Sequence, residues 1–120
     1  TVEKAEAEPN DTAAQATQLS SGERITGVIS KKADQDWYRF TVEEESSCRL
    51  SLQFDRQENS SDSFTLQLEQ HGKEVLAKKI PLNKGEYSSD IRFPKGSYFI
   101  RVGTDSRKEL PYTLTLHHLD

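Results

Sequence analysis

The feature that most restricts how this chain can fold is a polar–apolar alternation with a period of two. In "DWYRFTV" (residues 36–42), it places Tyr38, Phe40 and Val42 on one side of an extended strand. The same alternation recurs in "ERITGVI" (23–29), "CRLSLQF" (48–54), "SFTLQLEQ" (63–70), "KEVLAKKI" (73–80), "SSDIRF" (88–93), "YFIRVG" (98–103) and "PYTLTLHHL" (111–119). About eight strands with turn residues every ~8 to 12 positions predict an all-β sandwich or barrel, and we favour a two-layer sandwich.

The residues between these strands indicate how the strands connect. "HG" (71–72) and "PKGS" (94–97) are typical of tight turns, and "DRQENSSD" (55–62) has the composition of an exposed loop. We expect the two strands on either side of that loop to pair with each other. Helix-favouring composition is confined to residues 2–19, where Asp11 or Thr12 could cap a short turn through the alanines. Cys48 keeps the register of the apolar side chains in its strand, so we expect a small buried residue.

Size and charge exclude several classes of protein. With 120 residues, the chain has room for one hydrophobic core and therefore one domain. A net charge of −4, with basic residues scattered along the sequence, disfavours nucleic acid and acidic membrane surfaces as partners. No apolar run approaches the ~20 residues that a membrane span requires. The chain is therefore either cytosolic or the mature part of a secreted protein.

Catalytic signatures are weak. His71 falls in a turn, and His117 and His118 are neighbours on one strand, so their side chains point to opposite faces and are ill placed to bind one metal ion. No nucleophile, zinc or phosphate-binding motif is present in the sequence. We therefore expect a protein that is not an enzyme, with a free-standing secreted enzyme or inhibitor as the least favoured alternative.

Two groups of oxygen-bearing side chains precede the first and the second long strands. They consist of Glu6, Glu8, Asn10 and Asp11, followed by Asp34 and Asp36. Glu6, Glu8 and Asn10 alternate, and Pro9 favours an extended Glu8, so these three side chains would point the same way. Carboxylates and amides are the ligands that calcium takes, and a cation would relieve the repulsion between the groups if they met. Two interpretations stay open from the residues alone: a calcium site, or two solvated acidic loops.

A family resemblance favours the first interpretation. It is carried by "EAEPNDTAAQATQL" (6–19), "ITGVI" (25–29), "DQDWYRFTV" (34–42), "KGSYFIRVG" (95–103) and "PYTLTL" (111–116). In this order, these segments resemble the bacterial pre-peptidase C-terminal domain, an accessory module of secreted peptidases related to the collagen-binding domain of clostridial collagenases. The resemblance extends from Glu6 to Leu116.

The resemblance implies a jelly-roll-like antiparallel β-sandwich in a single domain spanning residues 1–120. Residues 1–22 would form a linker and calcium-binding segment, and residues 23–118 the sandwich. The implied calcium ligands are the six side chains named above, together with a backbone carbonyl near residues 30–32. In calcium-binding relatives the linker can change from helix to strand when the metal binds, and the composition of residues 1–8 suits such a change.

The implied function is a secreted, monomeric, non-catalytic module. Its partner would be a neighbouring catalytic domain in a larger precursor or an extracellular polymer, and it would assist attachment, secretion or stability. The alternative is a carbohydrate- or collagen-binding module that uses exposed aromatic side chains. Trp37, Tyr87 and Phe99 are the candidates for that surface.

Overall fold

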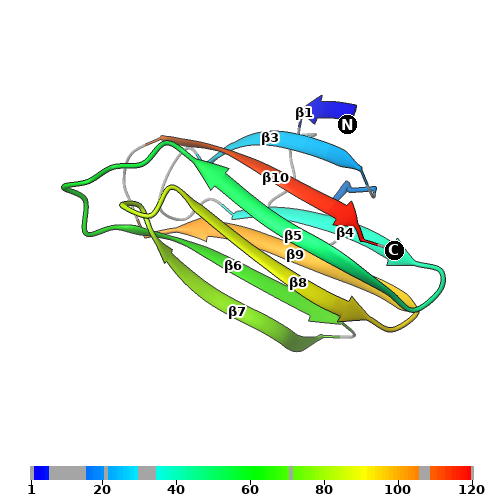
Figure 1. The fold of residues 1–120 in the computed structure, drawn as a ribbon. Helices are drawn as coiled ribbons and strands as arrows, with labels where there is room; N and C mark the ends of the chain where they lie inside the picture. Colours follow the sequence, from blue (N-terminus) through cyan, green and yellow to red (C-terminus); the bar gives the residue numbers. More distant parts are fainter. Residues whose placement is uncertain are drawn as a thin grey trace.

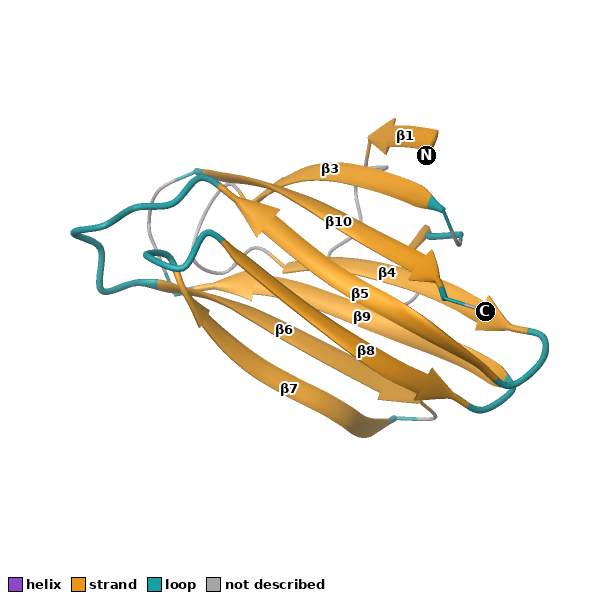
Figure 2. Ribbon diagram, in the orientation of Figure 1, coloured by secondary structure: helices purple, strands orange, loops and turns teal. Residues whose placement is uncertain are grey.

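A computed structural model of the chain describes residues 2–5, 16–20, 22–29, 35–70, 72–105 and 109–119, with residues 2–5 described as backbone. This part of the chain forms two five-stranded sheets packed face to face (Figures 1 and 2). The first sheet contains, in spatial order, β1 (Val2–Ala5), β3 (Glu23–Ile29), β10 (Leu110–His118), β5 (Ser46–Phe54) and β8 (Glu86–Phe93). The second contains β2 (Thr17–Gln18), β4 (Gln35–Val42), β9 (Gly96–Thr104), β6 (Ser63–Gln70) and β7 (Lys73–Pro81). The all-β sandwich with jelly-roll-like topology expected from the sequence is confirmed.

Each long strand that the sequence predicts is present, but one predicted pairing is wrong. The strands on either side of the 55–62 loop, β5 and β6, belong to different sheets, because the loop crosses from one layer to the other. β5 pairs with β10 and β8, whereas β6 pairs with β9 and β7. β6 and β7 form a hairpin whose turn contains Gly72 with a positive φ of 74°, a conformation that favours glycine. The period-two alternation identifies the strands, but it does not determine which strands pair with each other.

Along strands such as β4 and β10, the residues that alternate in the sequence lie alternately in the core and on the surface. β4 buries every second residue from Asp36 to Val42, and β10 buries Tyr112, Leu114 and Leu116. Cys48 is buried on β5, as expected. Aromatic rings fill the space between the layers: the rings of Phe40 and Tyr98 stack with centroids 5.2 Å apart.

The N-terminal part of the chain contributes a strand to the edge of each sheet. β1 pairs in parallel with β3, and β2 pairs in parallel with β4. β2 leads to Leu19, whose side chain is fully buried in the core. The helical turn expected through the alanines lies outside the described residues. The described residues contain no helix that is long and apolar enough to cross a membrane.

Candidate functional site

Both acidic segments connect the same two edges of the sandwich. Residues 6–15 follow β1 and precede β2, whereas residues 30–34 follow β3 and precede β4. Because β1 pairs with β3 and β2 pairs with β4, both segments connect neighbouring strands of the first sheet to neighbouring strands of the second. Ala5 is paired with Thr26, three residues before the end of β3, and Thr17 is paired with Tyr38, three residues after the start of β4. The end of β1 and the start of β2 therefore lie beside the middle of β3 and of β4, the two strands that residues 30–34 connect.

Five of the six proposed calcium ligands, Glu6, Glu8, Asn10, Asp11 and Asp34, lie outside the described residues. The sixth, Asp36, is the second residue of β4 and is completely buried. Its Oδ2 accepts a hydrogen bond of 2.6 Å from the hydroxyl of Tyr112 on β10. This contact directs one carboxylate oxygen between the sheets, toward the core.

The Tyr112 hydroxyl also hydrogen-bonds the hydroxyl of Tyr38, which is fully buried on β4. Since Tyr112 donates its single proton to Asp36, Tyr38 is the donor in this second contact. Burial, and after it the proximity of Tyr38 and Asp36, raises the pKa of Tyr112 well above its usual value. Tyr112 therefore stays protonated, and the two hydroxyls form a directed chain that ends on the carboxylate.

Space for these hydroxyls comes from Gly27, which faces Tyr112 across the β3–β10 pair. A Cβ at Gly27 would lie 2.6 Å from the Tyr112 hydroxyl oxygen and 2.9 Å from that of Tyr38. No side chain larger than hydrogen fits between β3 and the two phenols without displacing them.

The donor chemistry of the two acidic segments is that of a calcium site, and the strands that flank the segments are paired. Carboxylate and amide oxygens are calcium ligands, and both acidic segments belong to connections at the same edges of the sandwich. Among the side chains that the structure describes, no group of three histidines, cysteines or carboxylates could hold a metal ion by itself. A calcium site would therefore depend on residues 6–15 and 30–34.

The candidate aromatic surface divides between the two sheets. Trp37 on β4 and Phe99 on β9 are half-buried on the outer face of the second sheet and pack edge to face, with ring centroids 6.2 Å apart. Tyr87 is on β8 in the other sheet, where it packs against the core. The structure therefore brings Trp37 and Phe99 together and separates Tyr87 from them.

Two arginines complete this outer surface, and the sequence reasoning did not include them as site residues. Arg101 lies opposite Trp37 in the β4–β9 register, with its guanidinium carbon 5.4 Å from the centre of the Trp37 ring. Arg39 lies opposite Phe99. We call Trp37, Arg39, Phe99 and Arg101 the aromatic–arginine patch. The signal was present in the sequence, because each strand carries an aromatic residue and an arginine two positions apart on its outward face.

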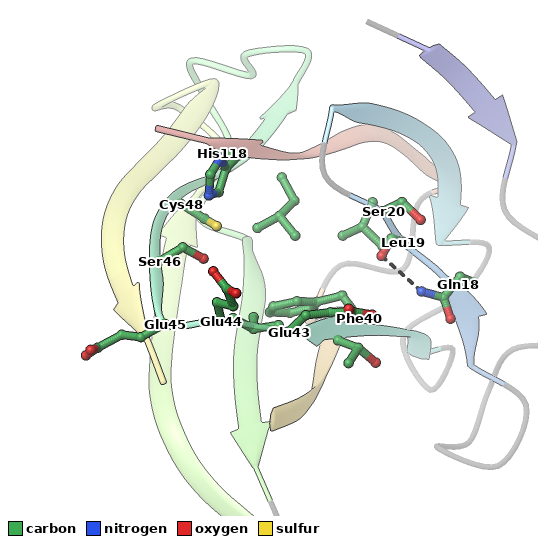
Figure 3. A pocket seen from close by; sticks show the side chains of 13 residues that line it. Gln18, Leu19, Ser20, Phe40, Glu43, Glu44, Glu45, Ser46, Cys48 and His118 are labelled. Atoms are coloured by element: carbon green, nitrogen blue, oxygen red, sulfur yellow. Dashed lines mark hydrogen bonds between the residues drawn. The ribbon is translucent and has the colours of Figure 1, made fainter. Parts of the chain in front are cut away.

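A separate hollow of about 750 Å³ lies near the opposite ends of these strands. Its apolar lining includes Leu19, Phe40 and Leu116, and the turn of residues 43–45 contributes three glutamates. In Figure 3 the side chains of Glu44, Cys48 and His118 are on one side of this hollow. His118 and Cys48 are direct neighbours in the β10–β5 register.

No protein-family model matches the chain, and no curated protein matches it significantly. Solved structures do match. The pre-peptidase C-terminal domain of a collagenase from Bacillus anthracis superposes with a TM-score of 0.67 and 15% identity, over 92% of this chain and 98% of that one. The resemblance inferred from the sequence motifs is therefore confirmed for the fold.

Two other similar structures have different functions. One is a periplasmic inhibitor of g-type lysozyme from Aeromonas hydrophila, with a TM-score of 0.57 and 12% identity, over 98% of this chain and 100% of that one. The other is a family 35 carbohydrate-binding module from an environmental isolate, with a TM-score of 0.52 and 10% identity, over 92% and 89% of the two chains. At these identities the likeness shows a shared β-sandwich fold, and a fold of this kind hosts many functions.

Proposed function

We propose that this chain is a calcium-binding, non-catalytic accessory domain of a secreted bacterial protein, in which it attaches a neighbouring catalytic domain to an extracellular substrate. The observation that carries the proposal is that the strands flanking one acidic segment pair with those flanking the other, β1 with β3 and β2 with β4. The collagenase domain and the carbohydrate-binding module among the similar structures are consistent with an accessory binding domain. A peptidase is the partner domain that the family resemblance favours.

In this proposal calcium connects the two sheets. Glu6, Glu8, Asn10 and Asp11 would supply ligands from the connection after β1, and Asp34 would supply one from the connection before β4. One carboxylate oxygen of Asp36 accepts a hydrogen bond from Tyr112 in the core. Asp36 would therefore either coordinate calcium through its other oxygen alone or serve only to hold the start of β4 in place. The ion supplies positive charge that offsets the repulsion between these carboxylates.

A non-catalytic role is supported by the placement of the residues that could carry catalysis. Cys48 is buried, and His117 and His118 are exposed at the end of β10. His71 lies outside the described residues.

Attachment is supported by Trp37 and Phe99, which lie together on the outer face of the second sheet. A carbohydrate- or collagen-binding role is therefore compatible with the calcium role, because the two would use different parts of the domain.

Thermal unfolding tests the calcium site. We expect calcium to raise the unfolding midpoint relative to a chelator, because a ligand that binds only the native state stabilises it by about 2.7 kcal/mol at 100 times its dissociation constant. Asp34→Ala should abolish this shift. Asp55→Ala is the matched control, since it removes the same charge from an exposed loop and should leave the shift intact. Equal midpoints in calcium and chelator, with Asp34→Ala indistinguishable from the wild type, would rule out the calcium site.

A further inference from the structure

The aromatic–arginine patch forms a two-by-two array on adjacent strands. Trp37 is opposite Arg101, and Arg39 is opposite Phe99, so each aromatic residue has an arginine beside it both across and along the strands. β4 and β9 lie side by side in the second sheet (Figure 1). Arg39 is exposed, and the other three side chains are half-buried. Flat rings and cationic groups therefore share one accessible face.

The arginines of this patch differ from several other arginines in the structure. Arg49, Arg56 and Arg92 each form an ion pair with a carboxylate. Arg101 instead stacks on Trp37, and the Nε of Arg39 donates to the amide oxygen of Gln18 at 3.3 Å. Within the described part of the chain, neither guanidinium pairs with a carboxylate. Stacking and amide contacts leave their positive charge available to an anion.

The charge around the patch is mixed but positive over β4 and β9. The next strand, β6, places Glu69 opposite Phe99 and Gln67 opposite Arg101. Gln67 donates to Glu74, and Lys79 pairs with Asp105, so the charges over β6 and β7 are partly balanced. Two cationic groups on one face of a chain with a net charge of −4 form a local site complementary to an anionic ligand.

A shallow hollow of about 390 Å³ adjoins the patch at Arg101. Its lining includes the amides of Gln35 and Gln67 and the hydroxyl of Thr65, and also the charged side chains of Glu74, Lys78 and Lys79. Amide and hydroxyl groups can both donate to and accept from the hydroxyls of a sugar, and aromatic rings pack against its apolar C–H faces. A polymer lying across this face would meet rings, cations and neutral polar groups in turn.

We infer that the aromatic–arginine patch and this hollow bind an acidic polysaccharide, with Arg39 and Arg101 recognising its carboxylates. The inference rests on the proposed attachment function and specifies its ligand class. Arginine suits the role because its planar fork of donors matches a carboxylate in two parallel hydrogen bonds. The amides and the hydroxyl in the hollow suit the hydroxyls of a sugar polymer, and Lys78 and Lys79 add positive charge beside Arg101 that suits an acidic one.

Affinity electrophoresis of the whole chain tests the inference. Polygalacturonate is the probe, and its methyl-esterified form is the control, because esterification removes the charge and keeps the sugar backbone. A chelator is present throughout, because calcium could otherwise bridge the carboxylates of the polysaccharide to those of the protein and cause retardation without the arginines. We expect retardation by the acid form and at least tenfold weaker binding to the ester. In Arg39→Gln/Arg101→Gln, binding to the acid form should fall at least tenfold, because hydrogen bonds to charged groups are lost.

Two further variants make the result specific to the patch. Arg49→Gln/Arg92→Gln removes the same two positive charges from the other sheet and should leave binding unchanged. Glu69→Gln removes the carboxylate beside the patch and should strengthen binding. Thermal unfolding of each variant verifies that the fold is retained.

Several results would overturn the inference. The first two are equal binding of the domain to polygalacturonate and to its methyl ester, and no binding to either. The third is unchanged binding to polygalacturonate in the double arginine variant. The fourth is retardation of the domain by dextran sulfate equal to that by polygalacturonate, which would assign the patch to sulfate. Binding to fibrillar collagen in place of the polysaccharide would also overturn it, and would leave the attachment function standing. The calcium-dependent midpoint is read separately, so failure here and failure of the calcium proposal are distinguishable.

Discussion

A single carboxylate inside the sandwich illustrates how individual residues fix this structure. Asp36 is fully buried, and burying a carboxylate costs several kcal/mol unless hydrogen bonds replace its water. Tyr112 supplies one such bond at 2.6 Å, and Tyr38 orients Tyr112 by donating to it. This chain of hydroxyls connects β4 in the second sheet to β10 in the first, so it also fixes the sheets relative to each other.

Removing one hydroxyl at a time tests this order of donors. We expect Tyr112→Phe to lower the free energy of unfolding by about 1–3 kcal/mol, because the buried Asp36 loses its donor. Tyr38→Phe removes a hydroxyl of the same size and leaves the contact between Tyr112 and Asp36 in place, so its loss should be smaller. Urea unfolding followed by circular dichroism measures both. An equal or larger loss in Tyr38→Phe would contradict the proposed direction of the chain.

At the scale of elements, the pairing of β3 with β10 depends on a glycine, which has no side chain to occupy the space between the sheets. Gly27 faces the interior between Ile25 and Ile29, at a position where alternation would place an apolar residue. The rings of Tyr38 and Tyr112 occupy that space instead. A glycine that would weaken an ordinary strand is therefore required here by close packing.

Gly27→Ala should therefore destabilise the domain by about 1–3 kcal/mol, the usual cost of overpacking a core. The new Cβ would approach the Tyr112 ring carbon Cζ to 2.7 Å, and the ring is confined between the sheets. Thr26→Ala is the control, because Thr26 is exposed on the same strand and the change should cost less than about 1 kcal/mol. Denaturant midpoints compare the two; a neutral or stabilising Gly27→Ala would show that the interior can adjust to the methyl group.

The elements were predictable from the sequence to the extent that local pattern determines them. Period-two alternation identified the long strands and the buried faces of β4 and β10, because one side of each strand must leave water. It did not predict that β5 and β6 separate, since pairing depends on contacts between distant segments. Asp36 was expected as a calcium ligand and not as a core residue, and its hydrogen bond to Tyr112 joins residues 76 positions apart. The calcium ligands stay a prediction.

At the scale of the whole molecule, the chain passes back and forth between two sheets. β6 and β7 are the only consecutive strands that pair within the described part of the chain. The other sheet contacts join strands separated by at least one intervening element, such as β3 with β10 and β5 with β8. Such contacts require long loops to close before they contribute stability.

We therefore expect folding on a timescale of about milliseconds to seconds, as in other sandwiches dominated by distant pairings. Trp37 is the only tryptophan, and its ring on β4 packs against Phe99 and Arg101 on β9, so its fluorescence reports the β4–β9 pairing directly. Stopped-flow refolding from urea measures the rate. The β6–β7 hairpin is the one local unit, and an isolated hairpin is only marginally stable in water, so it cannot by itself speed assembly of the sheets. Refolding within microseconds would mean that local contacts, and not the closure of the two sheets, determine the rate.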